Sequence, residues 1–596
     1  MPDRTETRDG AEVWFPALTV EVALYAALAL LAFFLRFFLL GSAPLNPDEA
    51  RQALAAWNFV RGIPDAFTGS PLLFTGNAIL FALFGATDTA ARFLPPLFGS
   101  ALVLIPALLR QHLGRAGALI ASALFVFSPS LVLFARQVDG TLIAVTCALA
   151  AIAFAWRYLD DHEPREIYFA AAFGALALLA APGAWTILFA AALFVFAIRL
   201  RGEQLPAFAI DLRRVALVFV LVFVGVATGF FFHRDGIGAA FDLFGAWLEG
   251  LRPGGSLFDP LRLLVLYDPI VLFAGAIALI EIAFAAREEE WHRKAIVLLA
   301  LWSVVAFVLS SVGGDKTPAR VVGIVAPLGL IAGWYLGAWL TRWIEALRAA
   351  TEARRLLLTQ EAPVFALAGA LSAFLYFALA EFALRGDVAV AEVVATNLGM
   401  PRENAVGLSA AIIVGLILVA FLAVAFLGIT TLGWARVRNL AVAFLLAVLT
   451  LWTLRQSIML NFTLTPNVQE WLTPRAEAPN VRDLVADVAD ASRWRANDSH
   501  TLAIVVDDAL GADVKWALRD QRYARFVTHP VATVDTPALL LTGDAPAPIG
   551  SWISQRYNLE FARVDAPLPS RVRWLMFRDV GSAQARTAVL WLPMPK

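Results

Sequence analysis

Apolar runs of membrane-spanning length recur through the first 460 residues of this chain. A helix needs about 20 mostly apolar residues to cross a bilayer. Hydrophobic residues make up 60% of the sequence and charged residues 16%, whereas soluble domains have about 25% charged residues. We therefore predict a polytopic α-helical membrane protein with about thirteen transmembrane helices, near residues 15–40, 87–110, 116–134, 140–157, 167–181, 184–200, 214–232, 262–286, 294–312, 319–345, 363–385, 404–429 and 439–460.

Arginine and lysine gather in alternate connections between these runs, which is the pattern of cytoplasmic loops. The pattern predicts a cytoplasmic tail at residues 1–14, an extracytoplasmic C-terminal region and a multi-pass protein of the cell membrane. The predicted cytoplasmic connections are 110–115, 157–165, 199–214, 287–294, 342–355 and 436–438.

The composition changes near Asn461, where charged residues return and apolar runs shorten. We expect a transmembrane domain over 15–460, with an outer loop at 41–86, and a small extracytoplasmic α/β domain over 461–596. Alternating elements favour a mainly parallel sheet. Its predicted strands are 501–506, 524–528, 538–542 and 572–577, and its predicted helices are 479–494 and 513–520.

The composition also excludes some ligands. A net charge of −1 gives no basic field for nucleic acid. No glycine-rich phosphate loop follows the first predicted strand, so no nucleotide cofactor is expected.

The segment Pro44–Gly62 follows the first apolar run and begins with two adjacent carboxylates, Asp48 and Glu49. Its apolar residues recur at helical spacing, which predicts an amphipathic helix in the bilayer interface. The acids are candidate catalytic residues and candidate ligands of a divalent cation. Alternatively, Asn46 and Glu49 form a capping box, which accounts for both acids structurally. For the next segment, Pro71–Phe84, we predict a second interfacial or re-entrant helix; the alternative is a short transmembrane helix.

Three basic residues are placed to hold a lipid phosphate on the same side of the membrane. Lys316 and Arg320 belong to the polar interruption GGDKTPAR between two apolar runs, where they could bind a phosphate. The alternative is that this segment is only a solvated connecting loop. Arg92 opens the second predicted span, where it either faces a cavity or extends to the interface.

Further polar residues are expected to line the same cavity. Arg51 follows the two acids, and Arg136 and Asp139 belong to the short outer loop 135–140. Charges at a membrane edge are costly unless solvated or paired, so Arg136 and Asp139 alternatively form a surface ion pair.

Together these segments resemble the GT-C class of membrane glycosyltransferases, which includes protein O-mannosyltransferases. The sequence PDEAR at Pro47–Arg51 is similar to the acidic motif of that class. The segments Ser70–Gly99 and Ser128–Gly140 resemble the parts that follow this motif.

A closer resemblance is to the flippase activity-associated family of dolichyl-phosphate-mannose-mannosyltransferase-like proteins. It is carried by Asp315–Gly337 and, in the C-terminal region, by Ala512–Phe526. The chain departs from this family at three places. It has Thr75-Gly76 where an aromatic-His pair is usual, Pro182-Gly183 where Lys-Glu is usual, and Ala319 where tryptophan is usual.

The resemblance implies transfer of a sugar, such as the hexose mannose, from a polyprenyl-phosphate carrier to an acceptor glycan, lipid or protein. Asp48 would be the general base and Glu49 would bind a divalent cation or orient the acceptor. Lys316, Arg320 and Arg92 would hold the donor phosphate. The alternatives are a flippase-associated or transport protein for lipid-linked sugars, and a non-catalytic scaffold with the same fold.

Overall fold

The computed structural model describes most of the chain and its side chains. The described residues are 19–63, 69–202, 211–284, 291–349, 357–385, 391–399, 401–462, 470–473, 475–477, 480–530, 538–563, 568–578 and 583–594. The predicted N-terminal tail lies outside them.

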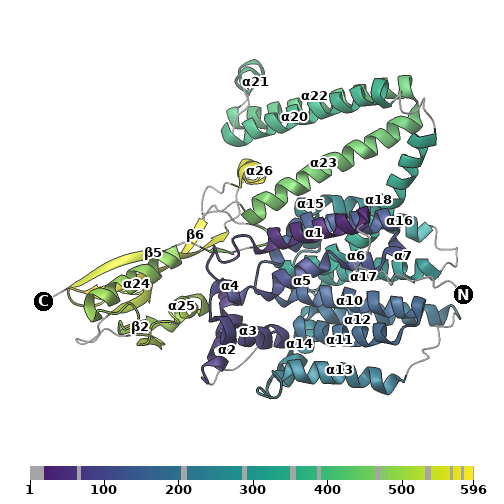
Figure 1. Cartoon of the computed structure of the whole chain (residues 1–596). Helices are drawn as coiled ribbons and strands as arrows, with labels where there is room; N and C mark the ends of the chain where they lie inside the picture. Colours follow the sequence, from purple (N-terminus) through teal and green to yellow (C-terminus); the bar gives the residue numbers. More distant parts are fainter. Residues whose placement is uncertain are drawn as a thin grey trace, which may run out of the picture.

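Helices dominate the first 462 residues (Figure 1). The first ten are α1 (Val20–Phe37), α2 (Pro47–Val60), α3 (Pro71–Phe84), α4 (Asp88–Ala91), α5 (Leu94–Leu102), α6 (Ile105–Leu108), α7 (Arg110–Leu113), α8 (Arg115–Phe127), α9 (Pro129–Phe134) and α10 (Gly140–Asp161). The others are α11 (Pro164–Ala180), α12 (Gly183–Leu200), α13 (Leu212–Ala227), α14 (Gly236–Gly250), α15 (Asp259–Tyr267), α16 (Pro269–Phe284), α17 (Trp291–Val312), the 3-10 turn η1 (Pro318–Arg320), α18 (Val321–Ala349), the π-helical turn η2 (Leu357–Glu361), α20 (Ala362–Arg385), α21 (Ala391–Leu398), α22 (Arg402–Leu432) and α23 (Trp434–Phe462).

Each predicted apolar run contains a helix, and eight helices of the described part are long and apolar enough to cross a membrane. A ninth span is added if the bent pair α15–α16 counts as one. The chain is thus a multi-pass membrane protein, as predicted. The predicted helices Pro71–Phe84 and Pro44–Gly62 are present as α3 and α2.

Three predicted spans are not continuous helices. The run 116–134 is divided at Ser128 between α8 and α9. The run 87–110 is divided among α4 to α7, where prolines at positions 95, 96 and 106 each begin or closely follow a helix start. The run 262–286 bends by 115° between α15 and α16. Asp268 separates these two helices and Pro269 begins the second, because the residue before a proline disfavours helical backbone.

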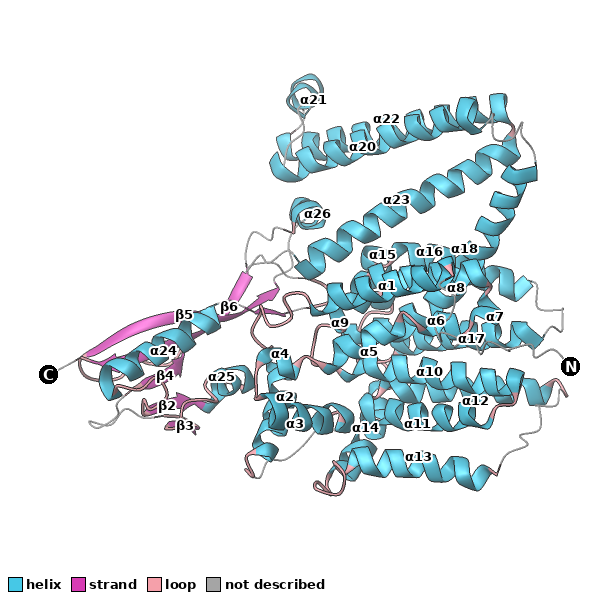
Figure 2. Ribbon diagram, viewed as in Figure 1, coloured by secondary structure: helices cyan, strands magenta, loops and turns pink. Residues whose placement is uncertain are grey.

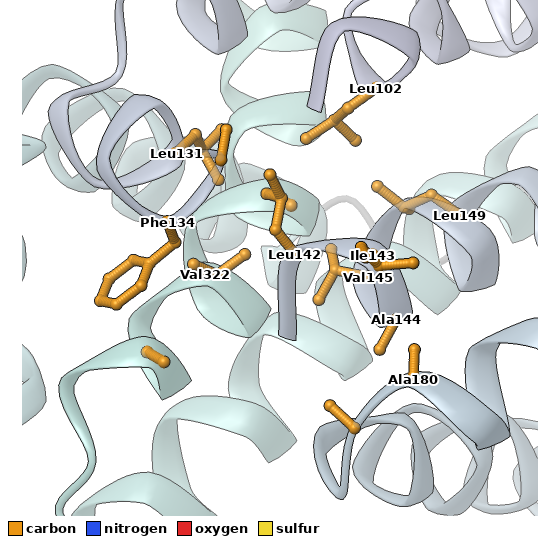
Figure 3. Close-up of a cluster of buried hydrophobic side chains, with 14 of the residues drawn as sticks. Leu102, Leu131, Phe134, Leu142, Ile143, Ala144, Val145, Leu149, Ala180 and Val322 are labelled. Atoms are coloured by element: carbon orange, nitrogen blue, oxygen red, sulfur yellow. The ribbon is translucent and has the colours of Figure 1, made fainter. Parts of the chain in front are cut away.

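The core of the bundle surrounds α10, whose side chains meet residues of α5, α9, α11 and α18 (Figure 3). Glycines permit the closest helix contacts, as is usual in membrane proteins. A Cβ at Gly337 of α18 would overlap the backbone of Gly117 in α8, and one at Gly140 would overlap the carbonyl oxygen of Ala180. The start of α10 is therefore held against the end of α11.

Six strands form one sheet in the C-terminal domain (Figure 2). The strand order is β1-β5-β6-β4-β2-β3; β2 pairs in parallel with β3 and β4, and the other neighbours are antiparallel. The domain contains β1 (Arg475–Glu477), α24 (Asn480–Ala496), β2 (Ile504–Asp507), η3 (Asp508–Leu510), α25 (Ala512–Ala517), β3 (Ala524–Val527), β4 (Leu539–Thr542), β5 (Trp552–Arg563), α26 (Leu568–Phe577) and β6 (Ala583–Pro593).

The small α/β domain is confirmed, but two details of the prediction are wrong. The sheet is mixed rather than mainly parallel, because the long strands β5 and β6 pair antiparallel with each other. The predicted strand 572–577 belongs to helix α26.

The C-terminal domain packs on the end of the bundle that carries α2 and α4 (Figure 1). Trp516 Nε1 donates to Asp88 Oδ1 at 2.7 Å, and Arg519 Nε donates to the carbonyl oxygen of Ala86 at 2.9 Å. A buried network also joins the two parts. Glu470 accepts a hydrogen bond from the Tyr267 hydroxyl at 2.7 Å and forms an ion pair with Arg578, whose Nε lies 2.7 Å from Glu470 Oε1. These contacts place α25 beside α2.

Candidate active site

Helix α2 begins with the predicted capping box. Asn46 Oδ1 accepts hydrogen bonds from the backbone N–H groups of Asp48 and Glu49, at 3.1 and 2.9 Å. Glu49 Oε2 accepts in return from the N–H of Asn46 at 3.0 Å. Pro47 is the first helical residue, where its missing N–H costs nothing. The capping residues therefore determine the direction in which the side chains of Asp48 and Glu49 point from the helix.

Glu49 is buried and forms an ion pair with Arg92. Arg92 Nη2 lies 2.6 Å from Glu49 Oε2, and Arg92 Nε lies 2.8 Å from Oε1. The backbone N–H of Val138 donates to the same Oε1 at 2.8 Å. Both carboxylate oxygens thus accept two hydrogen bonds each, and Glu49 joins α2 to the outer loop before α10.

The remaining N–H groups of Arg92 donate hydrogen bonds to backbone carbonyl oxygens. Nη1 donates to Leu40 at 3.3 Å and Ala43 at 2.7 Å, and Nη2 donates to Pro44 at 2.8 Å. A guanidinium has five N–H donors, and these contacts occupy all five. This geometry does not agree with the expected donor-phosphate role of Arg92, which instead fixes the segment between α1 and α2.

The expected cation role of Glu49 does not agree with the geometry either. Its four hydrogen bonds leave no lone pair directed at an ion. Within the described ranges, no group of three or more His, Cys, Asp or Glu side chains could hold a metal ion.

Asp48 points away from the buried pair. Its side chain is 87% exposed, and Oδ1 lies 3.0 Å from Arg51 Nη1 on the next turn of α2. An exposed carboxylate at the mouth of the bundle is accessible to a substrate hydroxyl.

Asp139 caps α10 and is half-buried. Its Oδ1 accepts from the N–H of Thr141 at 2.5 Å. Burial raises the pKa of this carboxyl above its usual value, as do the charges of Glu49 and Asp48, although the bonds from Thr141 oppose the shift. Asp139 therefore lies within electrostatic reach of both acids of α2.

Arg136 does not pair with Asp139 in the way that the surface-pair alternative required. Its Nη1 donates to the carbonyl oxygens of Leu35, Arg36 and Phe38, at 2.9, 3.3 and 2.7 Å. Arg136 thus satisfies the C-terminal carbonyls of α1.

A cavity of about 270 Å³ joins Asp139 to Arg320. Arg320 Nη2 lies 2.6 Å from Asp315 Oδ2, and its other N–H groups have no partner among the described residues. Burial alone would raise the pKa of Asp315, but hydrogen bonds from Thr317 and the charge of Arg320 together lower it below its usual range. The cavity is lined by Asp139, Thr141, Val145, Pro182, Gly183, Thr186, Trp247, Leu251, Trp302, Ala306, Leu309, Ser310, Asp315, Thr317, Ala319, Arg320 and Gly323.

Lys316 lies elsewhere, although it belongs to the same loop as Arg320. Its Nζ donates to the carbonyl oxygens of Ser310 and Ser311, at 3.0 and 2.7 Å. It thereby satisfies the end of α17, and it is absent from the described lining of the cavity.

The structure thus brings together two of the predicted residues, Asp139 and Arg320, in one cavity. Asp48 and Arg51 lie on the exposed side of α2, and Glu49 pairs with Arg92 behind them. Sequence reasoning did not assign roles to Asp315, Thr317 and the two cavity tryptophans, Trp247 and Trp302. Asp315 was detectable, since it interrupts an apolar region beside Lys316 and Arg320.

Comparison with known proteins gives a fold and a partial match to one family. The family described as dolichyl-phosphate-mannose-protein mannosyltransferase matches residues 69–228. A search of curated proteins found no match. Among solved structures, the chain is similar to ArnT from Cupriavidus metallidurans bound to undecaprenyl phosphate, with a TM-score of 0.51 and 16% identity over 96% of this chain and 99% of ArnT.

The chain has the GT-C fold. ArnT in the apo state gives a TM-score of 0.50 at 17% identity, again over 96% of this chain and 99% of ArnT. Archaeal oligosaccharyltransferase AglB from Archaeoglobus fulgidus, in complex with an inhibitory peptide and a dolichol-phosphate, is 12% identical over 85% of this chain and 64% of AglB, with a TM-score of 0.46.

Two of the three departures from the flippase activity-associated pattern line the cavity. Pro182-Gly183 and Ala319 lie in its wall with Asp139 and Arg320. The third departure includes Thr75, whose hydroxyl donates to the carbonyl oxygen of Val226 at 2.8 Å. Small residues therefore stand at the cavity positions where larger or charged ones are usual in that family.

Proposed function

We propose that this protein transfers a sugar, a hexose such as mannose, from a polyprenyl-phosphate carrier to an acceptor glycan, lipid or protein. The GT-C fold supports the class of reaction. The observation that carries the proposal is the cavity lined by both Arg320 and Asp139, of which Asp139 lies within electrostatic reach of Asp48. The arginine distribution in the sequence supports an extracytoplasmic position for this end of the bundle at the cell membrane.

Arg320 is the proposed ligand of the carrier phosphate. Its guanidinium forms one ion pair with Asp315, which leaves further N–H donors for an anion. Charge develops on the phosphate oxygen as the glycosidic bond breaks, and fixed donors stabilise that charge. Lys316, held on two carbonyl oxygens, supports this site by fixing the loop and by its positive charge.

Asp48 is the proposed general base. The acceptor hydroxyl oxygen attacks C1 of the sugar, the bond from C1 to the phosphate oxygen breaks, and its electron pair stays on the phosphate. Asp48 accepts the hydroxyl proton, and the configuration at C1 is inverted. Glu49 and Arg92 act as positioning residues, because they fix the start of α2 without facing the substrate.

The decisive experiment measures sugar transfer in membranes that contain the variant Asp48→Asn and a polyprenyl-phosphate-mannose donor. Because Asp48 is exposed, the variant should fold normally. Loss of a general base lowers a rate by about 10²–10⁴-fold, so transfer should become undetectable or nearly so. The control Asp161→Asn changes an exposed acid at the other end of α10 and should transfer at the normal rate.

Undiminished transfer by Asp48→Asn would remove Asp48 as the base. Loss of transfer in Asp139→Asn alone would assign that role to Asp139. A folded protein that shows no transfer with a series of polyprenyl-phosphate sugars would favour the second candidate, a non-catalytic scaffold. That candidate rests on the small residues at Pro182-Gly183 and Ala319 in the cavity wall.

A further inference from the structure

A second and larger cavity lies between the membrane-side helix α2 and the C-terminal domain. Its volume is about 860 Å³, within the range of about 300–1,000 Å³ that is usual for small-molecule sites. One wall is the outward side of α2, and the other is formed by α25, the turn after it and β3. We call it the interdomain cavity.

Basic side chains dominate the charge of the interdomain cavity. Five of its described lining residues are basic and one is acidic, namely Arg51, Arg61, Lys515, Arg519, Arg522 and the acid Asp520. Like charges repel, and a concave site with low-dielectric walls strengthens their field. An anion in the cavity would therefore be stabilised by this excess of positive charge.

Three of these basic residues have an acidic neighbour. Arg51 pairs with Asp48, Lys515 lies 2.5 Å from Asp508, and Arg519 lies 4.0 Å from Asp520. The side chains of Arg61 and Arg522 are exposed and have no hydrogen-bond or ion-pair partner among the described residues. They supply the most available forks for an anionic group.

The same cavity also has surfaces for a sugar ring. Trp57 and Phe526 line it from its two walls, and Arg519 stacks over Trp516 at 4.2 Å just behind it. The indole N–H of Trp57 has no hydrogen-bond partner in the described part of the chain. Aromatic faces beside cationic forks suit a ligand that combines apolar sugar faces with negative charge.

We propose that the interdomain cavity binds the acceptor, and that the acceptor is an anionic saccharide carrying phosphate groups. This inference rests on the proposed transferase function and extends it by naming the class of acceptor. Arg51 connects the two sites, since it lines the cavity and pairs with the proposed base. An acceptor phosphate on Arg51 draws it away from Asp48 and leaves that carboxylate to accept the proton.

The test measures binding rather than transfer. The full-length protein in zwitterionic nanodiscs is titrated with glucose 1,6-bisphosphate by calorimetry, and maltose is the neutral control probe. We expect binding of the bisphosphate that weakens with salt and no binding of maltose.

The variant Arg61→Glu/Arg522→Glu reverses the two charges that carry no internal pair. We expect its Kd for glucose 1,6-bisphosphate to rise about tenfold or more, since the loss of one charge-assisted hydrogen bond changes an equilibrium by about that factor. The matched control is Arg525→Glu, which lies on β3 between Ala524 and Phe526. Successive strand residues point to opposite faces, so Arg525 faces away from the cavity and its variant should bind normally.

Equal binding of maltose, or unchanged Kd in the double variant, would overturn the proposal. Loss of sugar-phosphate binding in nanodiscs of phosphatidylglycerol would show that lipid headgroups occupy the cavity, which would also overturn it. The Asp48→Asn variant should still bind the bisphosphate, because binding needs no base. Failure of the transfer experiment therefore leaves this result unaffected.

Discussion

Replacement of Arg92 by methionine tests whether the buried Glu49–Arg92 pair positions α2 or binds substrate. The variant leaves Glu49 buried with two backbone N–H donors and without its counter-charge. It also removes the donor from three carbonyl oxygens, those of Leu40, Ala43 and Pro44. Breaking a buried pair by removing one partner costs about 3–5 kcal/mol, and the lost carbonyl bonds place this case toward the upper end.

The free energy of unfolding is measured in mixed detergent micelles with increasing dodecyl sulfate. Arg92→Met should lose about 4 kcal/mol, and Glu49→Gln/Arg92→Met should lose much less than the sum of the two single variants, since it leaves no unpaired charge. The control Arg214→Gln removes an exposed arginine 3.6 Å from Asp211 and should change stability by less than about 1 kcal/mol.

Kinetics separate the two roles of Arg92. A phosphate ligand would raise the KM for the donor and leave stability unchanged, whereas a positioning residue lowers kcat and stability together. An Arg92→Met protein as stable as the wild type, with a raised KM for the donor alone, would refute the positioning role and restore Arg92 as a phosphate ligand.

Two further predictions concern Asp139 and Glu49. The raised pKa of Asp139 means that folding favours its protonated form, so its ionisation costs stability as the pH rises above the usual carboxyl pKa of about 3.9. The variant Asp139→Asn still caps α10 but cannot ionise. It should therefore raise the unfolding midpoint near neutral pH and leave the midpoint below about pH 4 unchanged. Because hydrogen bonds occupy the Glu49 carboxylate, treatment with EDTA should leave the transfer rate within about twofold, and a larger loss reversed by Mg²⁺ or Mn²⁺ would contradict the assignment of Glu49.

Local patterns carried most of what the sequence predicted. Apolar length located the helices, and the spacing of Asn46 and Glu49 identified the capping box, because both features depend on residues within one turn or one span. The strands β3 and β4 were recognisable from short runs rich in strand-forming residues.

Contacts between distant residues were not predictable in the same way. Arg92 and Glu49 are 43 positions apart, and nothing in either segment specifies that all five guanidinium donors meet Glu49 and the carbonyl oxygens of the segment between α1 and α2. The antiparallel pairing of β5 with β6 encloses α26, so its register depends on residues that are about 20–40 positions apart. The segment 572–577 has strand-like composition and forms a helix, because tertiary contacts override a weak local preference.

The geometry of α2 explains why adjacent acids acquire different roles. Successive residues of an α-helix are rotated by about 100°, so Asp48 and Glu49 cannot face the same site. Glu49 points into the bundle and fixes the helix, whereas Asp48 points outward with Arg51, which lies three residues later on the same face. Arg51 in turn lines the interdomain cavity, and Asp139, on the other side of the start of α2, lines the cavity of Arg320. The rigidly held start of α2 therefore keeps Asp48 next to Arg51 of the interdomain cavity and within electrostatic reach of Asp139 of the Arg320 cavity. A change that loosens Glu49 should impair transfer without weakening the binding of the carrier phosphate or of the acceptor.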